Sequence, residues 1–141
     1  MNEKYMLFLI ENRYYAIDIK NVQEIITSLK ILDIPRKKTF CKGIISLRGE
    51  ILPIINGRKI FNLEQSKEDK TIIILRNKEE CFGLLVEKVI DVIEIDKNKF
   101  LQAHEKNTNQ GIIEVNEKLY KFKEFTVSIL DIELFNDIVK E

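Results

Sequence analysis

The sequence has few of the residues that most often carry catalysis or bind metals. Its 141 residues include one histidine, His104, two cysteines, Cys41 and Cys81, and no tryptophan. A metal site needs several ligands at defined spacing, and a catalytic centre needs a base or nucleophile with supporting neighbours. His104 lies in a polar stretch, so we interpret it as a surface residue. We therefore expect no enzymatic activity, no metal and no cofactor.

The chain also lacks net charge and long apolar runs. Lys+Arg and Asp+Glu both number 23, so no long-range field favours nucleic acid or an anionic membrane as partner. Apolar runs such as 71–75 are strand-sized and fall far below the ~20 residues of a membrane span. The glycines fit neither a dinucleotide-binding pattern nor a P-loop. These absences disfavour binding of nucleic acid and nucleotides and direct insertion into a membrane.

The N-terminal residues and the two cysteines indicate a reducing compartment. The first residues lack the basic start and the cleavage site of a signal peptide, so we expect a cytoplasmic protein. Cys41 and Cys81 each lie among strand-like residues, which favours buried thiols over a disulfide.

The early aromatic residues alternate with aliphatic ones, which favours core packing over the base stacking of an OB-fold.

Short β-rich runs make up most of the chain. Three pairs of runs are separated by short turns, as in hairpins: 5–10 with 14–19, 43–49 with 50–55, and 71–75 with 81–86. Shorter runs follow the same pattern at 30–34, 112–115, 118–122 and 126–130. Gly49 supplies the backbone freedom for a tight turn. The pattern predicts an all-β protein, either two small β-barrels or one large sandwich.

Helical segments are expected to be short. Asp18 can cap one or two turns over 20–26, and a second turn is expected at 58–63. Asp131 can cap a C-terminal helix with one apolar face. The most polar segment, 64–70, lacks apolar periodicity and is the best candidate for a connector between two lobes.

The two halves of the sequence share a pattern. Placing Val89 on Val22, an offset of 67 residues, also places Phe82 on Tyr15 and Gly83 on Ala16. Both halves then read aromatic, small and aliphatic, followed by Val-x-Asp/Glu-aliphatic in a helical turn. The repeat predicts a single domain, 1–141, made of two pseudo-repeated β lobes.

Five motifs occur in order along the chain. They are Tyr-Ala-Ile-Asp-Ile at 15–19, Val-Gln-Glu-Ile at 22–25, Lys-Gly-Ile-Ile-Ser-Leu-Arg-Gly at 42–49, Ile-Leu-Pro-Ile at 51–54, and Gly-Leu-Leu-Val-Glu-Lys-Val at 83–89. The sequence resembles the CheW-like family of chemotaxis coupling proteins over essentially its whole length. The resemblance implies an all-β fold of two small SH3-like five-stranded β-barrel lobes, with short helical turns and a C-terminal helix.

The match to the family has three departures. Ser46 replaces the usual Asn, and Glu87 stands for Asp. Asn56-Gly57-Arg58 stands where Asp-Leu-Arg is typical, which exchanges a buried leucine for a turn-forming glycine. We therefore expect the end of that strand to be altered.

The resemblance also implies a function. It implies a stand-alone adaptor that couples the signalling tips of chemoreceptors to the histidine kinase CheA by contact alone, recruited to membrane-bound receptor arrays. The alternative is a scaffold of the same fold that serves a different signalling partner. Because a receptor tip is a helical bundle, its receiving site should be an apolar groove.

Candidate contact residues follow from these expectations. The candidates for receptor contact are Arg48, Gly49, Ile45, Leu47, Ile72, Val89 and Val92. The candidates that match the kinase-facing positions of the family are Val22, Glu24, Lys42 and Gly43. Each aliphatic receptor candidate can equally be a core residue. Arg48 differs, because a guanidinium beside a glycine turn can present several planar donors to a partner.

Overall fold

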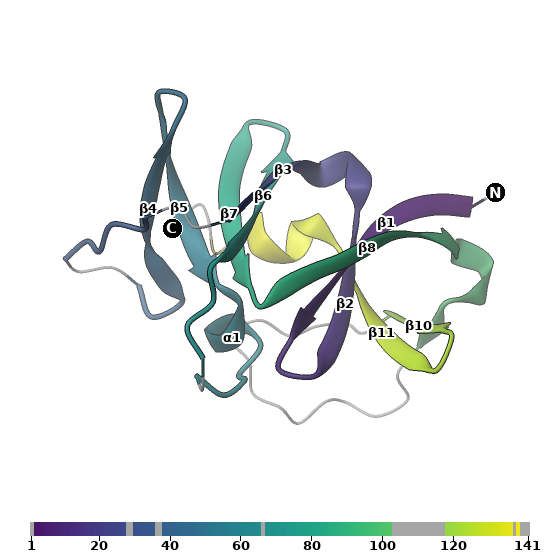
Figure 1. Cartoon of the computed structure of the whole chain (residues 1–141). Helices are drawn as coiled ribbons and strands as arrows, with labels where there is room; N and C mark the ends of the chain where they lie inside the picture. Colours follow the sequence, from purple (N-terminus) through teal and green to yellow (C-terminus); the bar gives the residue numbers. More distant parts are fainter. Residues whose placement is uncertain are drawn as a thin grey trace.

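Two β-sheets dominate the computed structural model, which describes residues 2–27, 30–35, 38–65, 67–102, 118–136 and 138 (Figure 1). The first sheet has the order β8 (Lys88–Asp96), β1 (Asn2–Ile10), β2 (Arg13–Asp18), β11 (Phe125–Leu130), β10 (Lys118–Phe122) and β9 (Leu101–Gln102). The second has the order β3 (Val22–Thr27), β6 (Thr71–Asn77), β7 (Glu80–Val86), β5 (Glu50–Asn56) and β4 (Cys41–Leu47). The predicted all-β class and the three predicted hairpins are confirmed, and the two-residue β9 adds a sixth strand to the first sheet.

The short helices share one local cause. They are η1 (Ile19–Asn21), α1 (Gly57–Ile60), η2 (Lys97–Lys99) and η3 (Ile132–Phe135). Each follows a residue whose side-chain oxygen accepts a hydrogen bond from the backbone of the first turn: Asp18, Asn56, Asp96 and Asp131 respectively. Such side chains compete with the sheet for backbone donors and start a turn where a strand ends. Among the described residues, no helix is long and apolar enough to cross a membrane.

Two segments predicted as helical turns are strands. Residues 22–26 belong to β3, and the helical turn that Asp18 caps is η1. The equivalent segment 89–92 belongs to β8. β3 alternates half-buried and exposed residues, and it pairs antiparallel with β6. β-branched Val and Ile at these positions fit a half-buried pleated surface better than a helix, so long-range pairing overrides the helical spacing.

Smaller differences concern the connections. Segment 30–34 forms a single bridge, Leu32 with Ile44, in place of a strand, and the turn predicted at 58–63 starts one residue earlier as α1. Segment 64–70, expected between lobes, joins α1 to β6 within the second sheet. The chain instead crosses between sheets at η1 and at Glu87. His104 and the predicted strand 112–115 lie outside the described residues.

The C-terminal helix stays a prediction. The structure describes η3 there, with Ile132, Phe135 and Ile138 buried, and residues 137 and 139–141 lie outside the described residues. Cys41 and Cys81 are free thiols, as expected, but only Cys81 is buried, whereas Cys41 is half-buried. Burial raises the pKa of the Cys81 thiol.

Strand exchange links the two sheets. After the hairpin β1–β2, the chain crosses to the second sheet, where β3 pairs with β6. After the hairpin β6–β7 it crosses back, and β8 pairs with β1. The parallel pairs also correspond, since Ile129 of β11 pairs with Ala16 and Ile54 of β5 pairs with Gly83. A duplication would produce this arrangement, and the duplication itself stays a prediction.

Three apolar clusters fill the molecule. The largest lies between the sheets and takes residues from both, including Phe8, Tyr15, Phe82 and Phe135. A second cluster belongs to the first sheet and a third to the second sheet. Each sheet therefore packs one face on a shared core and folds the other around a core of its own.

The β4–β5 turn offers a test of local strain. Gly49 has a φ of 84°, and a Cβ added there meets no atom within 4 Å. Because the surroundings are open, the cost of a β-branched side chain at Gly49 is limited to backbone strain. We expect Gly49→Val to lower the free energy of unfolding by about 2 kcal/mol, and Gly49→Asn to have little effect, because Asn tolerates this conformation. Urea denaturation measures both, and equal stability of the two variants would contradict the reading.

Candidate functional site

The turn between β4 and β5 places a charged side chain at the end of the second sheet. Arg48 and Gly49 both have positive φ values, 47° and 84°, which is typical of the tight type I′ hairpin turn. The positive φ of Gly49 agrees with the expectation that this glycine supplies the backbone freedom for the turn. The side chain of Arg48 is 70% exposed, as expected for a charge at a turn.

Arg48 forms a two-pronged ion pair with Glu24 of β3. Its Nη2 donates to Glu24 Oε2 at 3.1 Å, and its Nη1 donates to Oε1. β3 and β4 are the two outer strands of the second sheet, so the pair bridges the opposite edges of that sheet. The hydrogen bond from Arg48 lowers the pKa of the Glu24 carboxyl. The structure thus joins a receptor-contact candidate to a kinase-contact candidate.

A second arginine extends this polar rim. Arg76 of β6 donates from Nε to Gln23 Oε1 at 2.8 Å and from Nη2 to Glu50 Oε1 at 3.4 Å. Gln23 and Glu24 are neighbours on β3, and Glu50 follows the Arg48–Gly49 turn. Charged and amide groups from three strands therefore surround this end of the sheet.

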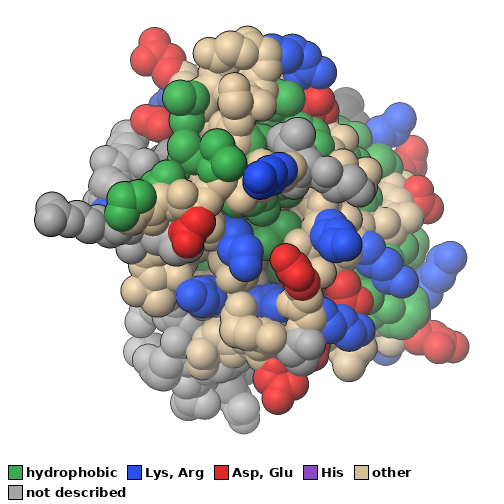
Figure 2. Space-filling view, turned by 60° about the vertical axis from the view of Figure 1, so that its left-hand side comes forward, with side chains coloured by type: hydrophobic (Ala, Val, Ile, Leu, Met, Phe, Trp, Pro, Cys, Tyr) green, Lys and Arg blue, Asp and Glu red, His purple; other side chains and the backbone are tan. Residues whose placement is uncertain are grey.

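Beside the polar rim lies an apolar surface, which we call the outer apolar face and define as Leu32, Ile44, Ile51 and Pro53. Ile44 pairs with Pro53, and Ser46 pairs with Ile51. The alternate pair, Ile45 with Leu52, is buried, so these side chains point outward. Ile51 is 70% exposed and Leu32 49%. In Figure 2, hydrophobic side chains gather toward one side of the face turned forward, with Lys and Arg side chains across its middle.

Gly43 allows Leu32 to join this face. Leu32 and Ile44 exchange backbone hydrogen bonds of 2.8 and 2.9 Å, and a Cβ on Gly43 would lie 2.2 Å from the Leu32 carbonyl oxygen. Gly43 also follows an irregularity in the β4–β5 register and has a φ of 154°, which residues with side chains rarely adopt. Lys42 beside it is exposed. Lys42 and Gly43 thus stand at the end of β4 opposite to Arg48.

The remaining candidates do not form one surface. Ile45 and Ile72 are each 1% exposed within the core of the second sheet, and Leu47 packs against that core. Val22 and Val89 pack against the shared core, half-buried. Val92 is 40% exposed on β8 of the first sheet. The side chains of Ile45 and Ile72 are therefore core residues, whereas Val92 can meet a partner.

Sequence reasoning missed two features, the exposure of Ile51 on the outer apolar face and the buried ion pairs of Arg58. Ile51 had a signal, because Leu52 and Ile54 must face the core and strand alternation then turns Ile51 outward. Arg58 was expected to start a helical turn, and its match to the family's Asp-Leu-Arg was given no role, yet it is 1% exposed and pairs with three carboxylates. No spacing in the sequence shows that those carboxylates converge.

The structure defines a two-sheet β-protein that presents an apolar face and a charged rim on its second sheet. The profile of the CheW-like domain matches residues 4–138. The chain belongs to the CheW-like domain family.

Individual relatives agree with this membership. The chemotaxis protein CheW of Thermotoga maritima is 33% identical over 93 residues, which cover 65% of this chain and 62% of that protein, less than two thirds of its length. The chemotaxis protein CheW of Bacillus subtilis is 28% identical over 134 residues, which cover 92% of this chain and 83% of that protein. The crystal structure of the scaffolding protein TtCheW from Thermoanaerobacter tengcongensis is similar with a TM-score of 0.84 and 30% identity, covering 96% of this chain and 93% of that one.

The Arg48–Glu24 pair predicts a shifted titration. The pKa of Glu24 lies below its ordinary value of 4.5 because Arg48 favours the charged carboxylate. A lowered pKa means that the pair stabilises the fold above pH 4.5 and that this contribution is lost as the pH falls through the lowered pKa. In Arg48→Ala, we expect the Glu24 pKa to rise toward 4.5.

Carbon-detected NMR titration measures this shift directly. Glu3 serves as an internal control, because its pKa is lowered by a hydrogen bond from Lys97 and should not change in Arg48→Ala. An unchanged Glu24 pKa in that variant would show that the pair does not exist in solution.

Proposed function

We propose that this protein is a chemotaxis adaptor that joins the signalling tips of chemoreceptors to a CheA-type histidine kinase. It acts by protein–protein contact, without catalysis or cofactor, in the cytoplasm at membrane-bound receptor arrays. Two of its relatives are named chemotaxis protein CheW, and the similar solved structure is named a scaffolding protein. The same fold and the whole-length family match support the proposal.

The observation that carries the proposal is the outer apolar face beside the Arg48–Glu24 pair. Protein interfaces combine an apolar centre with a polar rim that fixes orientation. Ile51 and Leu32 supply exposed apolar area, and the arginine–carboxylate pair adjoins it. Contiguous exposed apolar patches that are rimmed by polar residues mark protein–protein interaction sites.

We assign the outer apolar face to the kinase. Lys42 and Gly43 stand at one end of β4, and Glu24 is held near its other end by Arg48. Three of the four kinase-contact candidates therefore flank this face. Gly43 contributes by admitting Leu32, and Val22 lies at the margin of the shared core.

The receptor contact draws on the hairpin tip and on β8. Arg48 and Gly49 are exposed at the tip, and Leu47 is half-buried beside them. Ile90 and Val92 of β8 are 42% and 40% exposed and offer aliphatic contacts of the kind that a helical bundle needs.

The Asn56-Gly57 departure gives no support to a different signalling partner. Gly57 is buried, and a Cβ there would lie 2.5 Å from the Leu85 carbonyl oxygen and 2.8 Å from Ile10 Cδ1. It is the first residue of α1 and not a turn glycine, because its φ lies outside the left-handed region. The exchange changes internal packing and leaves the outer apolar face as it is.

The outer apolar face can be tested with one exposed residue. Ile51→Ser should leave the melting temperature nearly unchanged, because a side chain that is 70% exposed contributes little to the core. We expect the affinity for the kinase regulatory domain to fall about tenfold, as calorimetry would measure. Leu101→Ser is the matched control, since Leu101 is 54% exposed on β9 of the first sheet. Equal binding by both variants would remove this face from the kinase contact.

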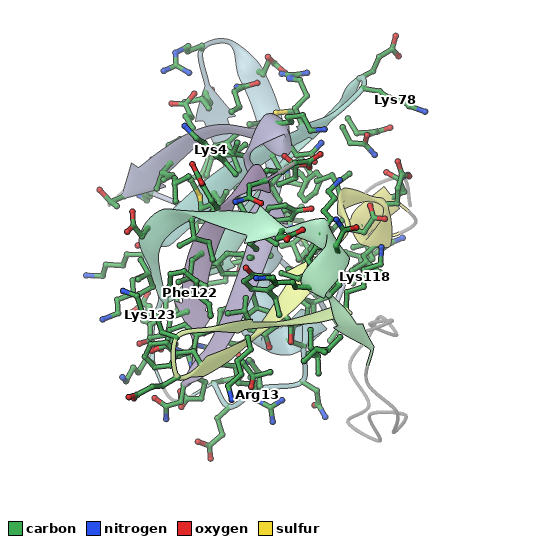
Figure 3. All side chains as sticks on the ribbon, turned by 90° about the vertical axis from the view of Figure 1, so that its right-hand side faces the viewer. Lys4, Arg13, Lys78, Lys118, Phe122 and Lys123 are labelled. Carbon is green, nitrogen blue, oxygen red and sulfur yellow. The ribbon has the colours of Figure 1, made fainter. Side chains whose placement is uncertain are left out.

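Arg48 can be tested in the same way. If it anchors a partner, Arg48→Ala should fold normally and weaken the complex of receptor, kinase and adaptor about tenfold or more, and Arg48→Lys should restore binding only in part. Kinase activation in a reconstituted mixture measures this, alongside thermal melts. Arg13→Ala is the control, because Arg13 is an exposed arginine at the start of β2 in the first sheet (Figure 3). Full activation by a well-folded Arg48→Ala protein would contradict the assignment.

A further inference from the structure

Arg58 is almost fully buried although it carries a full charge. Its side chain is 1% exposed, and its guanidinium makes five hydrogen bonds. Nε and Nη2 bind Asp69 Oδ2 and Oδ1 at 2.7 and 3.1 Å, Nη1 binds Glu11 Oε2 at 2.8 Å and Glu64 O at 3.0 Å, and Nη2 also binds Glu87 Oε1 at 3.0 Å. A guanidinium has five N–H donors, so every donor has a partner.

The partners of Arg58 come from separate parts of the fold. Glu11 lies in the turn between β1 and β2 of the first sheet. Glu87 is the residue between β7 of the second sheet and β8 of the first. Asp69 and Glu64 lie in the segment between α1 and β6. Arg58 itself follows β5 on α1, so one side chain binds both sheets, a crossing between them and a loop.

Further bonds reinforce this meeting point. The Glu11 backbone N–H donates to Glu87 Oε1 at 3.2 Å, and the Glu87 backbone N–H donates to the Leu9 carbonyl oxygen at 3.1 Å. Asn56 caps α1 by accepting from the backbone of Arg58 at 3.0 Å, which fixes the start of the arginine's own helix. The anchor points of the network are therefore backbone segments of both sheets.

The rest of the contact between the sheets consists chiefly of the shared apolar core, beside which Asn77 of β6 donates to Glu133 and Asn136 after β11 at 3.2 and 3.0 Å. Hydrophobic contact is non-directional and tolerates small rotations of one sheet on the other. Hydrogen bonds are directional, and a buried network that satisfies all its donors has few alternative geometries. The shared core can hold the sheets together, while the Arg58 network can define the angle between them.

We propose that Arg58 is a positioning residue that sets the angle between the two sheets, and through it the geometry of the two partner surfaces. The outer apolar face belongs to the second sheet, and the exposed residues of β8 belong to the first. The receptor contact combines the hairpin tip of the second sheet with these β8 residues, so receptor binding needs one relative orientation of the two sheets, whereas the kinase contact on the second sheet does not. This consequence rests on the proposed function, but the angle is a property of the free protein.

Two variants loosen the network while keeping the fold. Arg58→Lys keeps the charge, but an ammonium has three donors and cannot bind Asp69 with a planar fork. Glu11→Asn removes one hydrogen-bond partner of Arg58, because the shorter side chain does not reach the guanidinium. Asn also suits the φ of 46° at this turn position, so the turn is kept. Glu79→Asn is the matched control, since Glu79 is an exposed acidic residue in the β6–β7 turn.

The test measures the angle between the sheets in the free protein. Spin labels on unnatural amino acids at Ser46 of β4 and Lys121 of β10, both exposed and on different sheets, give an inter-sheet distance distribution by pulsed dipolar spectroscopy. We expect a shifted or broadened distribution in Arg58→Lys and in Glu11→Asn, and the wild-type distribution in Glu79→Asn. A loss of stability alone would lower the melting temperature without moving the distribution of the folded protein.

Binding measurements complete the test. In Arg58→Lys and Glu11→Asn, affinity for the kinase domain alone should stay within about twofold, whereas affinity for the receptor tip, and with it the ternary complex, should weaken about tenfold or more. A wild-type distance distribution in folded Arg58→Lys and Glu11→Asn would overturn the proposal, and if Arg58→Lys does not fold, Glu11→Asn decides. If the wild-type protein binds neither partner while the distribution still shifts, the proposed function fails and the positioning role stands.

Discussion

The shared apolar core between the sheets is the constraint on which the rest of the structure depends. Its strands are buried on both faces: Phe8 of β1 points into the shared core, whereas Leu7 points into the core of the first sheet. The same holds in β6, where Ile73 and Ile72 face opposite cores. Central strands therefore need continuous apolar sequence, and runs such as 72–75 and 82–86 supply it. Neither sheet would have both of its faces covered without the other.

This constraint also locates the surface that is free to bind. The strands at the outer side of the second sheet cover a core on one face only, so their outward residues are released from packing. Ile51 can be 70% exposed because Leu52 and Ile54 beside it supply the burial. A substitution at a residue of this kind can change partner binding without loss of stability. A substitution at Ile45 or Ile72 cannot, since both side chains are buried in the core.

Sequence alone predicted what depends on local chemistry. The hairpins, the positive φ of Gly49, the caps at Asp18 and Asp131 and the exposure of Arg48 all follow from neighbouring residues. The helical turn predicted at 22–26 was wrong, because Val22, Ile25 and Ile26 fit a helix and a strand equally well. Pairing with β6, about fifty residues away along the chain, makes the segment a strand. For the same reason the Arg48–Glu24 pair and the three carboxylates around Arg58 had no signal. They meet only after the sheets have formed.

Strand exchange and the Arg58 network act on the same relation between the sheets, but in different ways. β3 follows the first hairpin but pairs in the second sheet, and β8 follows the second hairpin but pairs in the first sheet. The sheets therefore cannot separate without breaking the backbone hydrogen bonds of a whole strand pair. Exchange of this kind makes the sheets inseparable, yet a crossing through η1 or through the single residue Glu87 still leaves their angle open. Arg58 binds that second crossing through Glu87 and the turn beside it through Glu11. A scaffold that must hold two partners needs both properties, since inseparable sheets at a variable angle would still bind the kinase on the second sheet but would not hold together the receptor contact that the two sheets share.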